Sequence, residues 1–224
     1  VYKQSEQTKS TGAVKQDEQH VALATTFALD VAGNRVAVGG PDRETVLFDI
    51  ETAKQVWKTK NLAPDPQTLL QPQVWPTAIR FLSSDCVLGS NIMAVGNGYK
   101  QVRIYDVRPT ATQRRPICWT PEGLLEHSVT AITQIDENHI VAGDAAGYLH
   151  TIDLRKLGRP IKTDASVQSV GRYVGPAGSV RGLVDHASSP RLAAAGFDRM
   201  LSTLDSNTTQ HGRCCVSRPQ LIRA

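Results

Sequence analysis

The side chains most often used in catalysis are scattered along this chain rather than grouped. The 224 residues include six histidines and four cysteines, and their spacing suggests no Ser-His-Asp or Cys-His grouping. The cysteines match neither a zinc knuckle nor a redox C-x-x-C motif, so we interpret them as free thiols in a reducing compartment. The histidines are His20, His127, His139, His150, His186 and His211, and the cysteines are Cys86, Cys118, Cys214 and Cys215. We therefore predict no enzyme, no metal site and no cofactor.

Basic residues gather in two places where they would suit a phosphate-bearing partner. Arginine binds phosphate through a planar fork of donors, so such clusters are candidate RNA contacts. The first cluster contains Lys100, Arg103, Arg108, Arg114 and Arg115, and the second contains Arg155, Lys156, Arg159 and Lys162. If both lie on the same side of adjacent structural units, they form one positive patch. The alternative, that these are ordinary solvated surface charges, remains open.

A repeating unit of short strands must position these residues. Each unit has short apolar runs separated by polar, Gly or Pro turns, and its third run ends in an aspartate that follows a glycine by nine or ten positions. The aspartates are Asp49, Asp106, Asp153 and Asp205, and the glycines are Gly39 or Gly40, Gly96, Gly143 and Gly196. The aspartates recur at intervals of roughly 50 residues, close to the period of a propeller blade. We assign the glycines to turns that need a positive φ.

This pattern predicts an all-β WD-repeat β-propeller with four visible blades. WD-repeat propellers usually have about seven blades, so we expect the chain to form part of a seven-bladed ring. In the third blade we expect the fourth strand at 160–163, and in the last blade at 213–218. The predicted segments are a polar leader at 1–20, blades at 21–60, 74–120, 121–163 and 164–218, a Pro-rich connection at 61–73 and a tail at 219–224.

Composition limits the possible functions. The chain is 40% hydrophobic and carries 25 basic and 21 acidic residues, a formal net charge of +4. This modest excess permits contact with nucleic acid without requiring it. No apolar run approaches the ~20 residues that cross a bilayer, so we expect no membrane role and no small-molecule substrate.

The last blade also contains three residues that merit individual interpretation. Asp198 lies in the turn before the third strand, where an acid in WD repeats accepts backbone hydrogen bonds, so we predict that it locks the blade. Arg181 lies within the first strand, where a charge is costly unless it is paired or at an exposed end, so it is a candidate partner contact. Arg199 is expected to reach solvent at the rim of the blade, where it is a further candidate contact with rRNA or a partner.

Two segments of the last blade, A-G-S-V-R-G-L-V-D-H and A-G-F-D-R-M-L-S-T-L-D, closely resemble the final blade of one WD-repeat family. That family assists early assembly of the large ribosomal subunit in the nucleolus. The segments V-W-K-T-K-N and G-Y-K-Q-V-R-I-Y-D-V-R agree with it too, and the resemblance covers roughly residues 36–218. The chain departs from the repeat pattern at Leu204, which stands where the usual Trp would be.

The resemblance implies a nuclear, nucleolar scaffold bound to assembly factors and rRNA precursor, and linked to a AAA-type ATPase. An alternative is a WD-repeat substrate receptor of a cullin-type ubiquitin ligase. Such receptors resemble WD-repeat propellers in which the third strands of consecutive blades end in aromatic-Asp-x-Arg. The sequence at 105–108 matches that ending, and 152–155 matches it without the aromatic. A propeller enzyme would need inward-pointing carboxylates or metal ligands, and the sequence offers no clear set.

Overall fold

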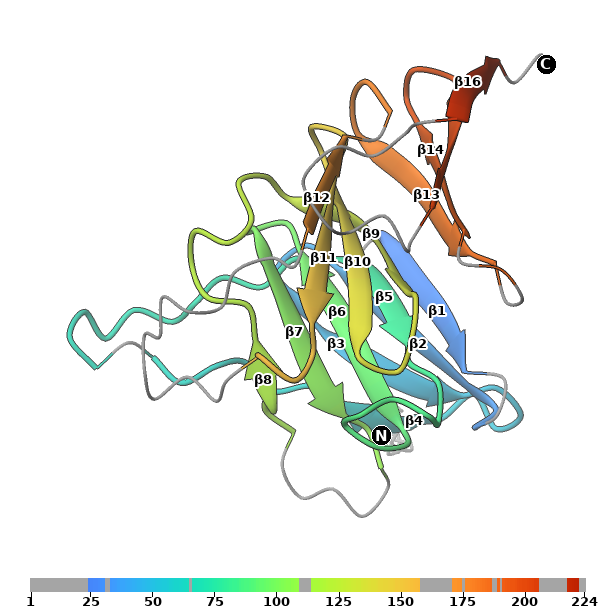
Figure 1. Ribbon diagram of the computed structural model, residues 1–224. Helices are drawn as coiled ribbons and strands as arrows, with labels where there is room; N and C mark the ends of the chain where they lie inside the picture. The colour runs from blue at the N-terminus through green and yellow to red at the C-terminus, as the bar shows by residue number, and fades with distance from the viewer. Residues whose placement is uncertain are drawn as a thin grey trace, which may run out of the picture.

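The structure is a computed structural model that describes residues 24–30, 33–64, 66–108, 114–157, 171–174, 176–186, 189, 191–205 and 217–221. The regular elements in this part of the chain are all β-strands. They form four antiparallel sheets of four strands each, numbered blades 1 to 4 in chain order (Figure 1). The predicted all-β architecture of four propeller blades is thus confirmed, whereas a ring of seven stays a prediction. No helix in the described residues is long and apolar enough to cross a membrane.

In every blade the strands follow the chain order across the sheet. Blade 1 contains β1 (Thr26–Asp30), β2 (Arg35–Gly40), β3 (Arg43–Asp49) and β4 (Gln55–Lys58). Blade 2 contains β5 (Pro76–Phe81), β6 (Ile92–Asn97), β7 (Gln101–Asp106) and β8 (Cys118–Trp119). Blade 3 contains β9 (Val129–Gln134), β10 (His139–Asp144), β11 (Tyr148–Asp153) and β12 (Gly171–Val174). Blade 4 contains β13 (Val180–Asp185), β14 (Arg191–Gly196), β15 (Met200–Asp205) and β16 (Ser217–Leu221).

The first strand of each blade lies innermost. Strand β1 contacts β5, β5 contacts β9, and β9 contacts β13, so the four inner strands follow one another around a common axis. The later strands of each blade extend outward, and blade 4 lies at the top of the view in Figure 1. This is the arrangement expected of consecutive propeller blades.

Two strands do not lie where the sequence predicted. The outer strand of blade 3 is β12, which pairs with β11 from Tyr148↔Val174 to Thr151↔Gly171. Blade 3 therefore reaches past the predicted boundary at residue 163, and the strand expected at 160–163 lies outside the described residues. In blade 4, β16 extends to Leu221, into the segment predicted to be a tail.

The core lies between the blades, because the middle strands have both faces covered. In β6, Ile92 and Ala94 pack in the cluster shared with blade 3, while Met93 and Val95 pack in the cluster shared with blade 1. A third cluster joins Val141 and other residues of blade 3 to blade 4. Side chains alternate between the two faces of a strand, so a middle strand must be apolar along its whole length.

The recurring glycines serve close packing between neighbouring blades. A Cβ built on Gly96 would lie 2.5 Å from Val129, and one on Gly143 would lie 2.8 Å from Val180; both valines begin the inner strand of the next blade. Neither glycine is among the residues with positive φ. Our assignment of these glycines to positive-φ turns is therefore wrong, because the backbone itself comes too close to the next blade for any side chain.

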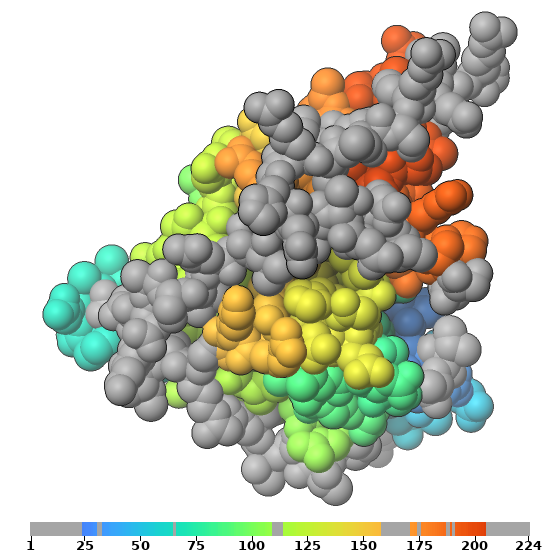
Figure 2. All heavy atoms as spheres, viewed as in Figure 1, coloured from blue at the N-terminus to red at the C-terminus, as the bar shows by residue number. Residues whose placement is uncertain are grey.

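Each blade has two ends, which we call the turn end and the Asp end. The turn end carries the turns from second to third strand, where Asp42, Lys100, Gly147 and Arg199 all have positive φ. The Asp end is where the third strands stop, at Asp49, Asp106, Asp153 and Asp205. The parts of the connection at 61–64 and 66–75 project from the side of blades 1 and 2 (Figures 1 and 2).

Candidate functional site

The predicted first basic cluster is divided by the fold. Lys100 is exposed in the β6–β7 turn, at the turn end. Arg108 follows β7 at the Asp end, so six residues of strand separate the two. Arg114 and Arg115 are exposed in the connection from β7 to β8. A single patch that includes Lys100 and the other members of this cluster is therefore ruled out.

The prediction that Arg103 contacts RNA also needs correction, because its side chain is buried rather than available to a partner. Only 3% of the residue is exposed. Its guanidinium donates to Gln101 Oε1 at 2.8 Å, to Asn61 Oδ1 at 3.0 Å and to the Gln73 carbonyl at 3.3 Å. Side chains alternate along β7, since Tyr105 and Val107 pack toward blade 1 and Val102 and Ile104 toward blade 3. Both faces of the strand are therefore covered by neighbouring blades.

Two arginines at the Asp end bind the aspartate two residues before them. Arg108 Nε donates to both carboxylate oxygens of Asp106, at 3.0 and 2.9 Å. Arg155 Nε and Nη2 each donate to Asp153 at 3.0 Å. These hydrogen bonds hold the pKa of Asp106 and of Asp153 below its usual range. Much of the charge of both arginines is thus already compensated within their own blade.

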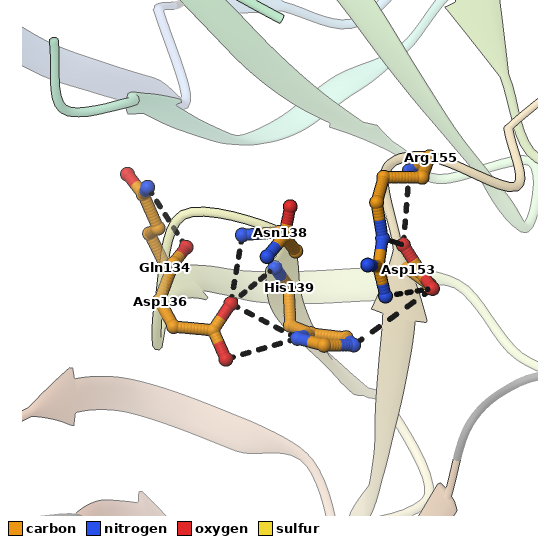
Figure 3. Close-up of polar contacts among 6 residues, drawn as sticks. All are labelled: Gln134, Asp136, Asn138, His139, Asp153 and Arg155. Atoms are coloured by element: carbon orange, nitrogen blue, oxygen red, sulfur yellow. Dashed lines mark hydrogen bonds and ion pairs between the residues drawn. The ribbon is translucent and has the colours of Figure 1, made fainter. Parts of the chain in front are cut away.

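Figure 3 shows how the pair in blade 3 extends into a polar network. Asp136 accepts hydrogen bonds from the backbone of Asn138 and His139, and His139 Nδ1 lies 2.9 Å from both its carboxylate oxygens. On the other side, His139 Nε2 lies 3.9 Å from Asp153 Oδ2. The imidazole therefore bridges the loop before β10 to the end of β11. Sequence analysis missed this network, although the D-x-N-H spacing is a signal for such a turn.

The network also joins neighbouring blades. Gln134 accepts a hydrogen bond from the Ser83 backbone at 2.7 Å and donates to Ser83 Oγ at 3.0 Å. The Val87 N–H donates to the Glu137 carbonyl at 2.9 Å. These bonds place the Asp ends of blades 2 and 3 beside each other. The arrangement fixes loops, and it presents no nucleophile poised beside a base.

In blade 4 the predicted role of Asp198 as a backbone acceptor is confirmed. Its carboxylate accepts hydrogen bonds from the backbone N–H of Ala177 at 2.8 Å and of Met200 at 3.0 Å. These bonds tie the β14–β15 turn to the segment before β13. Arg181 is exposed, and its guanidinium carbon lies 4.2 Å from the ring centroid of Phe197. Strand β13 has a register shift between Val180 and Gly182, which explains how a charged residue within it reaches solvent.

Of the remaining residues predicted to contact a partner, two are exposed and two lie outside the described part of the chain. Lys156 and Arg199 are exposed. Arg159 and Lys162 lie outside the described residues. Among the residues that the structure describes, no group of three or more His, Cys, Asp or Glu side chains could hold a metal ion.

Comparison with known proteins relates this chain to one class of protein. No family model matches it. Human WD repeat-containing protein 74 is 38% identical over 168 residues, which are 74% of this chain and 38% of the human protein; the bovine protein of that name is 37% identical over the same share. A WD repeat-containing protein of Dictyostelium discoideum is 25% identical over 83% of this chain and 33% of that protein. This chain thus spans well under half the length of these relatives.

The fold has a counterpart among solved structures. A crystal structure of the computationally designed Ika8 protein superposes with a TM-score of 0.58, covering 88% of this chain and 48% of that one. The sequence identity is 17%, so this likeness concerns the fold alone. The four-stranded sheets, the inner strands in sequence around one axis and the WD-repeat relatives lead to one conclusion: the chain belongs to the WD-repeat β-propeller proteins.

Proposed function

We propose that this chain is part of a non-enzymatic interaction scaffold in the assembly of the large ribosomal subunit. It binds nucleolar precursor particles, made of assembly factors and rRNA, and is linked to a AAA-type ATPase that remodels them. The motifs of the last blade support this proposal, as does the similarity to WD repeat-containing protein 74. WD-repeat proteins are generally scaffolds without catalytic activity.

The observation that carries the proposal is that cations are exposed in the connections that follow the third strands of blades 2 and 3. Arg114, Arg115 and Lys156 are exposed, and no ion pair engages them within the described residues. They remain available for phosphate, unlike Arg108 and Arg155, which bind their own aspartates. Cations that neutralise phosphates release counterions and give salt-dependent affinity.

Acidic side chains are exposed at the same end of the blades. Glu51, Asp85 and Glu137 lie in loops at the Asp ends of blades 1, 2 and 3. A purely phosphate-binding surface would avoid them, because they repel RNA. The mixture suits a particle that presents both rRNA phosphates and the basic side chains of assembly proteins.

Charge reversal tests this surface. The triple variant Arg114→Glu, Arg115→Glu, Lys156→Glu should move the tagged protein away from large-subunit precursors in sucrose gradients of cell extract, with a larger loss at raised salt. A matched triple variant, Lys100→Glu, Arg181→Glu, Arg199→Glu, makes the same change in charge at the turn end and should co-sediment normally. If only the turn-end variant detaches, the contact lies at the other end.

Affinity purification tests the function itself. The tagged protein should recover rRNA precursor and assembly factors. Recovery of a cullin and its adaptor without rRNA precursor would refute the proposal and support the ubiquitin-ligase alternative.

A further inference from the structure

Two adjacent leucines are exposed in the connection between β4 and β5. Leu69 is 79% exposed and Leu70 is 70% exposed. The connection that carries them projects from the side of blades 1 and 2, and Figure 2 shows it as a cyan knob at the left of the view. An apolar patch that is held away from the core marks an interaction site more often than a structural one. We call Leu69 and Leu70 the leucine tip.

Hydrogen bonds hold the base of this connection closed. Asn61 Nδ2 donates to the Pro72 carbonyl at 2.6 Å, which joins two residues that are eleven positions apart. From β7, Arg103 donates to Asn61 Oδ1 at 3.0 Å and to the Gln73 carbonyl at 3.3 Å. The connection thus leaves and rejoins the body of the protein at one anchored point, as a closed surface loop does.

The backbone at the leucine tip is held in an unfavourable conformation. Leu69 has a φ of +56°, in the left-handed region that a bulky side chain rarely adopts. Beside it, the N–H of Leu70 donates to Thr68 Oγ1 at 3.4 Å. Strained backbone of this kind is found chiefly at functional sites. A partner that binds the tip meets side chains that are already positioned, so less conformational entropy is lost on binding.

The charge of the connection favours protein over RNA or an anionic membrane as the partner. The described residues of this loop, 61–64 and 66–73, are all uncharged, and the sequence between them adds one acid, Asp65. Phosphate-bearing surfaces are bound through lysine and arginine. A neutral, convex, apolar tip instead suits an apolar cleft of a protein.

The connection begins beside the cations that support the proposed function. The Lys60 N–H donates to the Arg114 carbonyl at 2.8 Å, and the exposed Arg114 and Arg115 follow one another directly in the sequence. The base of the projecting loop and these two arginines therefore lie on the same flank of the molecule. A particle that is bound through the arginines also faces the root of this loop.

We propose that the leucine tip inserts into an apolar cleft of an assembly protein on the large-subunit precursor particle. This inference rests on the proposed function and assigns to it a second contact, distinct in chemistry from phosphate binding by Arg114 and Arg115. The arginines hold rRNA through charge, and the leucines hold a protein neighbour through burial of apolar surface.

A pelleting titration with purified large-subunit precursor particles tests the proposal. The particles are sedimented through a sucrose cushion with increasing amounts of the tagged protein. The double variant Leu69→Ser, Leu70→Ser should weaken binding at least about tenfold, because burial of even one leucine side chain contributes that much. The factor should be the same at low and at raised salt, because salt screens charges and not apolar contacts.

The matched control is Leu69→Met, Leu70→Met, which keeps the tip apolar and should change the affinity less than about threefold. Both leucines are exposed, so neither pair of substitutions opens the core. A photo-reactive amino acid placed at position 70 should crosslink to a protein of the particle, and the Leu69→Ser substitution should reduce the yield of that crosslink.

The outcomes separate this proposal from the proposed function. Equal binding by the serine variant and the unchanged protein would overturn the proposal and leave the proposed function intact. Crosslinks from position 70 to rRNA, or to a second copy of this chain, would also overturn it. Failure of the unchanged protein to bind the particles would refute the proposed function, and this inference with it.

Discussion

Arg35 joins blade 1 to blade 2 at the Asp end and offers the sharpest test of how the blades are held together. Its Nε donates to Asp30 Oδ2 at 3.0 Å, its Nη2 donates to Asn91 Oδ1 at 2.8 Å, and its Nη1 donates to the Val107 carbonyl at 3.0 Å. Asp30 belongs to blade 1, and the other two acceptors belong to blade 2. Replacement by methionine keeps most of the apolar stem and removes only the guanidinium.

The expected magnitude follows from burial. The side chains of Arg35 and Asp30 are 9% and 13% exposed, so the pair is close to fully buried. Removing one partner of a buried ion pair destabilises by about 3–5 kcal/mol, because the other charge is left uncompensated. The slight remaining exposure of Asp30 places the expected loss near the lower limit, at about 3 kcal/mol.

Urea denaturation followed by tryptophan fluorescence measures this loss. Trp57 is buried, and its ring lies edge-on to that of Tyr105, with centroids 6.3 Å apart, so it reports on the junction of blades 1 and 2. The double variant Arg35→Met, Asp30→Ala should lose less stability than the sum of the two single variants, because neither leaves a lone charge. Arg115→Met removes an exposed guanidinium and should stay within about 0.5 kcal/mol. A loss below about 1 kcal/mol for Arg35→Met, indistinguishable from this control, would refute the reasoning.

Three further predictions concern single positions. Gly147→Ala should destabilise the protein well beyond the strain of about 1–2 kcal/mol for a left-handed residue, because the new Cβ would lie 2.0 Å from the Pro176 carbonyl oxygen. The control is Gly123→Ala, whose Cβ meets nothing within 4 Å, and thermal melts should show the backbone strain alone for that variant. Asp198→Ala should cost about 1 kcal/mol, as for a lost helix cap, and equal stability of the two proteins in urea would contradict its role in the turn. Burial lowers the pKa of His150, so as the pH falls this histidine is protonated in the unfolded chain before it is protonated in the folded one. The free energy of unfolding should therefore decrease as the pH drops below about 6.5. His150→Gln should flatten this pH dependence, and an unchanged slope would assign the pH dependence to other groups.

The repeat was predictable because every blade uses the same local rules. The strands β5 to β7 and β9 to β11 all lie inside the blades predicted at 74–120 and 121–163, because each is a short run of residues bounded by turn-forming segments. The outer strand of blade 3 was not predictable, because an outer strand has one open edge and its position depends on pairing with β11 rather than on a strong apolar pattern of its own. The residue types of Gly171 and Arg172 do not indicate a strand, and the burial of Tyr173, which only the structure reveals, fixes the position of β12.

The candidate contacts were harder to predict than the strands. Charge alone put Arg103 beside Lys100 in one surface cluster, yet the connection after β4 covers Arg103 with Asn61 and Gln73. Asn61 and Gln73 are distant from Arg103 in the sequence, so no local sequence pattern predicts their contact with it. The pairing of Arg108 with Asp106, by contrast, is visible in the sequence as two opposite charges two residues apart at a strand end.

The way the blades share their cores determines how this molecule comes apart. The three apolar clusters join blade 1 to 2, blade 2 to 3 and blade 3 to 4, so stability is close to a sum of nearest-neighbour couplings along a line. Folding can begin at the large cluster between blades 2 and 3 and spread in both directions. Within the described residues, blades 2 and 3 each share apolar clusters on two sides and blades 1 and 4 on one, so a destabilising change in blade 2 or blade 3 weakens two junctions at once.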